Sequence, residues 1–295
     1  MDMRVLIGVA ILAAAEVRAE ALMLQPATSA YADRTGEALR NPEGVACSSG
    51  KVVVADSGNG RLLVYGFKDG ALTGGEAIKF AELGVPVRVQ IDSRGNVLVL
   101  DRLARRIVRV NERGGFGGVV QPTGVPPAGG YFPVSFKLDS ADNIHVLDAA
   151  SARVVVLSPS GAFIRQLAAP SGARLTDITV DGKGALLAVD ATAAQIFAAA
   201  AGSTTWAPLG RTLKESLSFP SYLTTTPKGL IVVVDGHGQG LVLLAPDGTY
   251  LGRRLAIGRT EGFVYYPAQV CVDDQGTTFV ADRGNQRLQI FTEVK

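Results

Sequence analysis

Short apolar runs alternate with polar residues and turns along most of this 295-residue chain. Residues 87–101 read VRVQIDSRGNVLVLD, in which two such runs flank a turn built from Asp, Gly and Asn. A period of two places successive side chains on opposite faces of a strand, and turns of this composition join antiparallel strands. The same pattern returns in residues 134–148, 176–190 and 268–282. It predicts a protein built from β-hairpins.

The second strand of each hairpin opens a motif that occurs six times. The clearest copies are VADSGNGRLLVY at residues 54–65 and VADRGNQRLQIF at residues 280–291. The shared aspartates are spaced by 45, 47, 42, 45 and 47 residues, and they are Asp56, Asp101, Asp148, Asp190, Asp235 and Asp282. A second landmark lies 14 or 15 residues before each, at Pro42, Pro86, Pro133, Leu175, Pro220 and Pro267. Each unit has room for four strands, so we expect an all-β, six-bladed propeller of four-stranded antiparallel blades.

The two ends of the chain suggest how the ring closes. Residues 292–295 are too few to form a fourth strand after the last motif, whereas residues 22–40 precede the first unit without an assigned role. We therefore expect the N-terminal segment to supply the outer strand of the last blade. This arrangement would cover an otherwise open sheet edge.

The repeat resembles the NHL repeat, whose signature is a proline-led strand, a turn, and a strand ending in Val-Ala-Asp with a following Asn and Arg. The match is most specific in the first and last units. It is weakest in the fourth, which has Leu175 for proline and Gln195 for arginine. The resemblance implies one NHL-type propeller over residues 20–295.

The repeated aspartates favour a structural role, because each can accept backbone N–H bonds in the turn that follows its strand. Arginine occupies the position five residues later in four units, at Arg61, Arg106, Arg153 and Arg287. Positions i and i+5 face each other across a four-residue loop, so we expect ion pairs there.

Residues 1–19 read MDMRVLIGVAILAAAEVRA, with a basic residue, a short apolar run and small residues before a cleavage position. This pattern is typical of a signal peptide, and an apolar first helix is the alternative. We expect a secreted or periplasmic protein with no membrane span after cleavage, because no other segment is as long and apolar as a span requires. The net charge of +2 does not indicate a nucleic-acid partner.

Catalytic motifs are mostly absent from the sequence, and only two histidines occur, His145 and His237. Lyases of the NHL type that place several histidines around a metal need more histidines than these two. Lactonase-like propellers hold calcium with carboxylates and asparagines, for which Glu43, Asn59 and Asp177 are candidates. A metal-dependent propeller hydrolase or lyase therefore stays open as the alternative. The favoured interpretation is a binding or scaffold propeller without a cofactor, either a monomeric ring or part of a larger complex.

The innermost strands supply the candidate binding residues. Positions two and four after the landmark are mostly polar, and we expect them to face the central channel. Five of them are proposed to line one mouth of the channel and to hold a protein, a peptide or another ligand: Arg88, Lys137, Asp177, Tyr222 and Gln269. A wet channel that merely tolerates polar residues is the alternative. The face that carries the starts of these strands is the expected docking surface, because variable loops converge there on a rigid scaffold.

The two cysteines, Cys47 and Cys271, occupy nearly equivalent inner strands of the first and last units. These units become neighbours when the ring closes. A disulfide would then join the two sides of the seam, and the alternative is two buried thiols.

Overall fold

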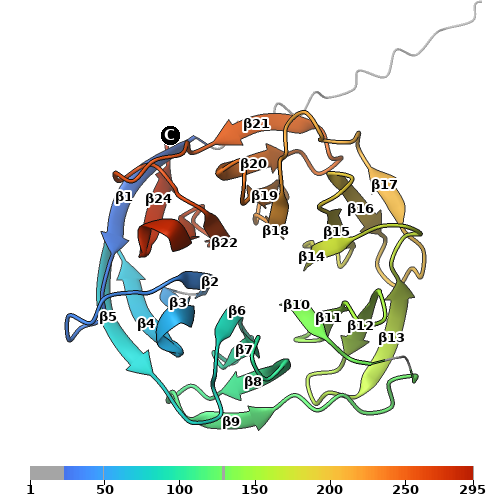
Figure 1. Ribbon diagram of the computed structural model, residues 1–295, viewed down its shortest axis with the longest axis horizontal. Helices are drawn as coiled ribbons and strands as arrows, with labels where there is room; N and C mark the ends of the chain where they lie inside the picture. Colours follow the sequence, from blue (N-terminus) through green and yellow to red (C-terminus); the bar gives the residue numbers. More distant parts are fainter. Residues whose placement is uncertain (1–22, 49, 128–129, 295) are drawn as a thin grey trace, which may run out of the picture.

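The computed structural model describes residues 23–48, 50–127 and 130–294, and the expected signal peptide lies outside these ranges. Six four-stranded antiparallel sheets are arranged around a central axis, as blades of a propeller (Figure 1). Among the described residues the only helical segments are two short 3₁₀ turns, η1 (Ser57–Asn59) and η2 (Arg283–Asn285). No helix in these ranges could span a membrane. The predicted fold class is confirmed.

The first three blades follow the chain from the innermost strand outward. Blade 1 contains β2 (Pro42–Ser48), β3 (Lys51–Asp56), β4 (Arg61–Lys68) and β5 (Ala71–Ile78). Blade 2 contains β6 (Pro86–Ile91), β7 (Val97–Asp101), β8 (Arg106–Val110) and β9 (Phe116–Val119). Blade 3 contains β10 (Pro133–Leu138), β11 (Ile144–Asp148), β12 (Arg153–Leu157) and β13 (Phe163–Ala168).

Blades 4 and 5 repeat this order, and blade 6 takes strands from both ends of the chain. Blade 4 contains β14 (Leu175–Val180), β15 (Leu186–Asp190), β16 (Gln195–Ala199) and β17 (Ala207–Leu209). Blade 5 contains β18 (Pro220–Thr225), β19 (Ile231–Asp235), β20 (Gly240–Leu244) and β21 (Tyr250–Arg254). Blade 6 contains β22 (Pro267–Val272), β23 (Thr278–Asp282), β24 (Arg287–Glu293) and, as its outer strand, β1 (Leu24–Ala30).

The closure by the N-terminal strand is confirmed. Strand β1 pairs antiparallel with β24, from Leu24 opposite Glu293 to Ala30 opposite Leu288. In Figure 1 these two strands lie side by side at the seam between the blue and red ends of the chain. The outer edge of blade 6 is therefore covered by the other end of the same chain.

The hydrophobic core consists of six clusters, each shared by two neighbouring blades. Between blades 6 and 1, for example, Val54 and Leu63 pack with Phe279 and Ile290, all of which are buried. Burial of these side chains is the main favourable contribution to folding, so each blade depends on both neighbours. The ring thereby holds the six innermost strands at fixed positions around the axis.

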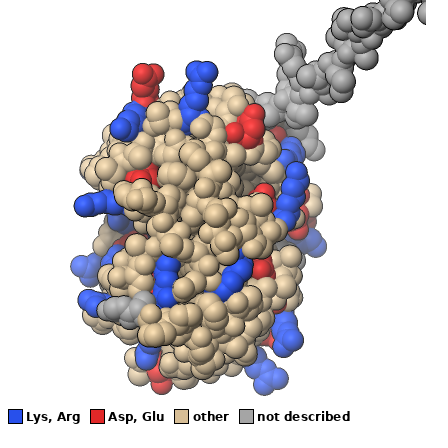
Figure 2. Space-filling view, turned by 90° about the vertical axis from the view of Figure 1, so that its right-hand side faces the viewer, with Lys and Arg blue, Asp and Glu red and all other residues tan. Residues whose placement is uncertain are grey.

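The outer side of blades 3 and 4 carries no concentrated charge. Figure 2 shows the side formed by blades 3 and 4, where acidic and basic side chains are scattered among uncharged ones. This distribution agrees with the low net charge of +2.

The ring has two ends, which we name here. The loop face carries the turns 57–60, 102–105, 149–152, 191–194, 236–239 and 283–286, and the hairpin face carries the turns 92–95, 139–142, 181–184, 226–229 and 273–276.

Candidate functional site

The five candidate channel residues lie on five different innermost strands, from β6 to β22, and the structure brings them together around Tyr222. The Lys137 ammonium donates a hydrogen bond to the Tyr222 hydroxyl and lies 3.9 Å from the centre of the Tyr222 ring. The Arg88 guanidinium carbon lies 5.4 Å from the same centre. Gln269 Nε2 donates to the Tyr222 hydroxyl over 3.3 Å. The Tyr222 ring of blade 5 therefore organises two cations and an amide from three other blades.

These residues fill the channel, whereas the sequence led us to expect an open mouth lined by all five. Lys137, Asp177, Tyr222 and Gln269 are 4%, 0%, 2% and 0% exposed, and only Arg88 is half-buried. The physical reason is that six strands converge on the axis and their side chains meet across it. The cluster closes the channel between its two ends.

Asp177 is the acidic member of this cluster. Its carboxylate accepts hydrogen bonds from the Ser135 hydroxyl and from the backbone N–H of Leu223 at 2.8 Å. Burial raises the pKa of Asp177, although Lys137 and Arg88 oppose this effect. None of the ion pairs among the described residues includes Asp177, so its hydrogen bonds connect inner strands rather than neutralise a cation directly.

A depression of about 160 Å³ lies on the loop-face side of the cluster. Its lining combines cationic, aromatic and small side chains, with one carboxylate: Glu43, Arg88, Phe219, Ser221, Gly236, His237, Tyr266, Pro267, Ala268 and Arg283. Glu43 pairs with Arg102 at 2.9 Å, so the Arg102 charge offsets the negative charge of Glu43 at the site. The depression can therefore accept an anionic group beside aromatic surface.

A backbone irregularity recurs at the start of every inner strand. Each strand shows a register shift directly after its landmark residue, which leaves the next residue outside the regular pairing. Glu43, Ser221 and Ala268 occupy this position in blades 1, 5 and 6, and all three line the loop-face depression. Bulges of this kind redirect a side chain, and here they supply part of the lining.

Aromatic residues and arginines gather around the depression on the loop face. Phe219 stacks on His237 with 4.9 Å between ring centres. Arg259 lies 5.2 Å from the centre of the Tyr265 ring, which in turn contacts the ring of Tyr266 at 4.7 Å. The sequence analysis missed most of these residues. A signal was present, because the residue before the landmark proline is aromatic in three units, at Phe132, Phe219 and Tyr266.

The aspartates of the repeat organise the loop face. Three of them form the expected ion pair with the arginine five residues later: Asp56–Arg61 at 2.7 Å, Asp148–Arg153 at 3.3 Å and Asp282–Arg287 at 2.9 Å. In blade 5 the arginine position holds Gly240, and Arg253 of the outer strand pairs with Asp235 at 2.7 Å instead.

Blade 2 departs from the expected ion pair. Asp101 accepts four backbone N–H groups, from Gly84, Val85, Leu103 and Ala104, at 2.9 to 3.3 Å. These bonds lower its pKa, against the opposing effect of burial. Arg106 donates to the Glu82 carbonyl at 2.8 Å. Because the turn N–H groups already occupy the Asp101 carboxylate, the expectation of an Asp101–Arg106 pair was wrong.

The hairpin-face end of the channel opens into a cavity of about 200 Å³. Lys137 and Tyr222 border it, together with Gln90, Thr179 and Thr224. The disulfide between Cys47 and Cys271 also lies in its wall, with 5.9 Å between the two Cα atoms.

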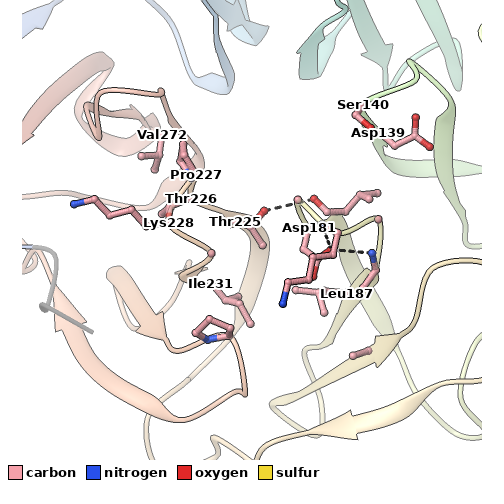
Figure 3. A pocket seen from close by; sticks show the side chains of 18 of the residues that line it. Asp139, Ser140, Asp181, Leu187, Thr225, Thr226, Pro227, Lys228, Ile231 and Val272 are labelled. Atoms are coloured by element: carbon pink, nitrogen blue, oxygen red, sulfur yellow. Dashed lines mark hydrogen bonds between the residues drawn. The ribbon is translucent and has the colours of Figure 1, made fainter. Parts of the chain in front are cut away.

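A groove of about 740 Å³ adjoins this cavity on the hairpin face, between blades 4 and 5. The two share three lining residues at the ends of inner strands, Leu138, Val180 and Thr225. Figure 3 shows Thr225 and Ile231 of blade 5 facing Asp181 and Leu187 of blade 4 across the groove. The channel end and the groove thus form a continuous hollow.

The residues considered for metal binding have other partners in the structure. Asn59 donates to Asp56 at 2.8 Å and Glu43 pairs with Arg102, so neither is directed toward Asp177. His145 is buried and its Nε2 lies 3.1 Å from Asp139. In residues 23–48, 50–127 and 130–294, no three His, Cys, Asp or Glu side chains are grouped closely enough to hold a metal ion.

Comparison with known proteins supports the repeat assignment and the fold. The model of the NHL repeat matches residues 39–65 and 264–291, and no curated protein matches the chain. A virginiamycin B lyase from Staphylococcus aureus is 15% identical with a TM-score of 0.63, over 92% of this chain and 100% of the other. A gluconolactonase from Xanthomonas campestris is 14% identical with a TM-score of 0.66, over 87% and 88%. A chain from a nidogen/laminin complex is 17% identical with a TM-score of 0.59, over 73% and 80%. Similarity at these identities shows a shared fold.

Proposed function

Because the chain is an NHL-repeat six-bladed β-propeller, we propose that it is an exported binding module whose loop face docks an acidic segment of a protein or peptide partner. The loop-face depression carries this proposal, because it combines Arg88 and Arg283 with the exposed surface of Phe219 and with Tyr266. Aromatic residues and arginine are enriched at the energetically important centres of protein interfaces.

Further support comes from the rigidity and the sealed floor of this face. The carboxylates of the repeat hold its turns through buried ion pairs and backbone hydrogen bonds, so the loops are ordered before a partner arrives. The channel cluster lies beneath the depression, and its buried members close the passage to the hairpin face. A partner is therefore expected to bind across the surface rather than to thread through the ring. The nidogen/laminin complex offers a parallel for a propeller in a protein complex.

Export rests on the signal-like pattern of residues 1–19 and on the disulfide between Cys47 and Cys271. Disulfides persist mainly in oxidising compartments, so the covalent seam suits a secreted or periplasmic protein. Expression of the full chain and N-terminal sequencing of the extracytoplasmic product test this part of the proposal. Cleavage after residue 19 is the expected result, and an uncleaved cytoplasmic product would contradict it.

The binding role is tested with purified protein. A partner captured from an extracytoplasmic extract is identified and purified, and its affinity is then measured for the wild type and for the Phe219→Ala/Arg283→Ala variant. Loss of an aromatic and a cationic contact should weaken binding by about tenfold or more, since central contacts of this type each contribute about 1–2 kcal/mol.

The control variant is Ile164→Ala/Arg94→Ala, which removes an exposed apolar side chain and an arginine away from the loop face. Ile164 is 48% exposed and Phe219 is 42% exposed, so the two apolar side chains are matched in exposure. The control should bind as the wild type does. Unchanged affinity of the loop-face variant would contradict the proposed surface. Metal-dependent hydrolysis of a lactone by the wild type would instead support the enzymatic alternative.

A further inference from the structure

The Lys137 ammonium is a buried cation with no carboxylate directly beside it. Its side chain is 4% exposed, and its hydrogen bond goes to the neutral hydroxyl of Tyr222. None of the ion pairs in the described part of the chain involves Lys137. Burying a charge is costly unless an opposite charge accompanies it. The site therefore favours an anion at the cavity that Lys137 borders.

The other charged groups of the channel leave this excess of positive charge in place. Arg88 donates to the carbonyl groups of Glu43, Val87 and Ser221 at 3.2 to 3.4 Å, and these acceptors carry no formal charge. Asp177 is held by Ser135 and Leu223, and burial raises its pKa. Two cations thus face a single carboxylate that is itself less readily ionised than usual.

The cavity at Lys137 also offers hydroxyl groups. Thr179 and Thr224 lie in its wall, and in the described ranges neither hydroxyl has a side-chain hydrogen bond. A carboxylate has two oxygens and about four acceptor positions. Together with the Lys137 ammonium, these hydroxyls can satisfy such a group.

The groove next to the cavity is apolar where the blade cores reach the surface. Leu138, Val180, Leu209 and Val272 line it, and each is only half-buried against one of the clusters between blades. Covering such surface is favourable by about 25 cal/mol per Å². Two of the charged side chains at the edge are engaged, since Asp181 accepts backbone N–H groups of its own turn and Lys228 pairs with Glu293 at 2.8 Å.

We propose that the cavity and the groove form one site on the hairpin face for an amphipathic carboxylate, with its head at Lys137 and its apolar chain between blades 4 and 5. The shared residues Leu138, Val180 and Thr225 provide the passage from head to chain. The cavity has a volume of about 200 Å³ and the groove a volume of about 740 Å³, and together they are in the size range of pockets that bind small molecules. This site lies at the opposite end of the channel from the loop-face surface and is independent of the proposed partner.

Calorimetry with the full-length protein tests the head and the chain separately. The probes are acetate, butyrate, hexanoate and octanoate, with octanol as the uncharged counterpart of octanoate, all below their micelle concentrations. Affinity should rise from butyrate to octanoate by about fourfold for each methylene that the groove covers completely. Octanol should bind at least tenfold more weakly than octanoate. Equal binding of all four acids, or of octanol and octanoate, would overturn the proposal.

Two variants locate the site. Lys137→Met removes the charge, keeps most of the length of the side chain and should reduce octanoate affinity at least tenfold, whereas Lys68→Met removes an exposed lysine from blade 1 and should leave it unchanged. Val180→Glu places a like charge in the groove and should also weaken octanoate binding, and it does not alter Lys137 itself. Wild-type affinity in a folded Lys137→Met protein would overturn the proposal. If that variant does not fold, wild-type affinity in Val180→Glu would overturn it.

Discussion

Cys47 and Cys271 are 224 residues apart in the sequence and joined by a disulfide that links the first innermost strand to the last. The Cys47 backbone N–H also points to the Cys271 sulfur at 3.0 Å. The disulfide crosses the seam where the ring closes. Together with the β1–β24 pairing, it holds blade 6 to blade 1 at both the inner and the outer edge of the propeller.

The disulfide should stabilise the ring strongly. Replacement of both cysteines by alanine is expected to lower the free energy of unfolding by about 2–5 kcal/mol. Without the disulfide the unfolded chain is no longer closed into a long covalent loop, so it gains conformational entropy. Chemical denaturation of the two proteins measures the difference. Thiol titration of the denatured, unreduced wild type should detect no free thiol, and two thiols per chain would contradict the bond.

Removal of β1 should destabilise the whole ring. A chain that begins at residue 31 lacks the strand that pairs with β24, so blade 6 is left with an open edge. We expect a thermal midpoint several degrees lower than that of a chain that begins at residue 23, which keeps β1. Equal midpoints in differential scanning calorimetry would show that the β1–β24 pairing contributes little.

The repeat aspartates should differ in their contribution to stability. Asp282→Ala leaves the buried Arg287 without its ion pair and is expected to cost about 3–5 kcal/mol. Asp101→Ala leaves turn N–H groups unpaired and is expected to cost about 1–3 kcal/mol. Urea denaturation of both variants tests the order. A larger loss for Asp101→Ala would contradict it.

His145 should make the protein less stable in mildly acidic solution. Burial lowers its pKa from 6.5, and the nearby Asp139 only partly opposes this shift. Below about pH 6.5 the unfolded chain therefore binds a proton that the folded chain resists, so the free energy of unfolding falls as the pH is lowered toward the folded pKa.

Urea unfolding of the wild type and His145→Gln at pH 7.5, 6.5 and 5.5 tests this expectation. The variant should show a flatter dependence over this range. His237→Gln is the matched control, because His237 is exposed on a loop-face turn, and it should keep the wild-type slope. If the pH dependence disappeared in His237→Gln but not in His145→Gln, the assignment of the effect to His145 would be contradicted.

The blades could be predicted from the sequence because each hairpin is specified locally. The landmark proline, the Asp-Gly turn and the strand ending in aspartate recur within about 15 residues, and short-range alternation assigns their faces. The closing strand followed from simple counting at the two ends. Neither the hairpin repeat nor the closing strand depends on how side chains from different blades pack at the axis.

The site could be predicted only in part, because its form depends on contacts between blades. Period-two alternation assigns the polar side chains of the inner strands to the axis, but it cannot tell a filled channel from an open one. That outcome depends on the lengths of side chains such as Lys137 and Tyr222 across a narrow space. The recurrent bulge that directs Glu43 and Ser221 to the loop face has no simple signature in composition or periodicity.

The covalent seam also determines how the ring would respond to mechanical force. The start of β1 and the end of β24 lie at the same end of their ladder, so tension on the two termini peels this pair apart one bridge at a time. Extension then stops at Cys47 and Cys271, because the disulfide carries the load between them. The blades enclosed by that covalent loop are shielded from tension until the bond is reduced.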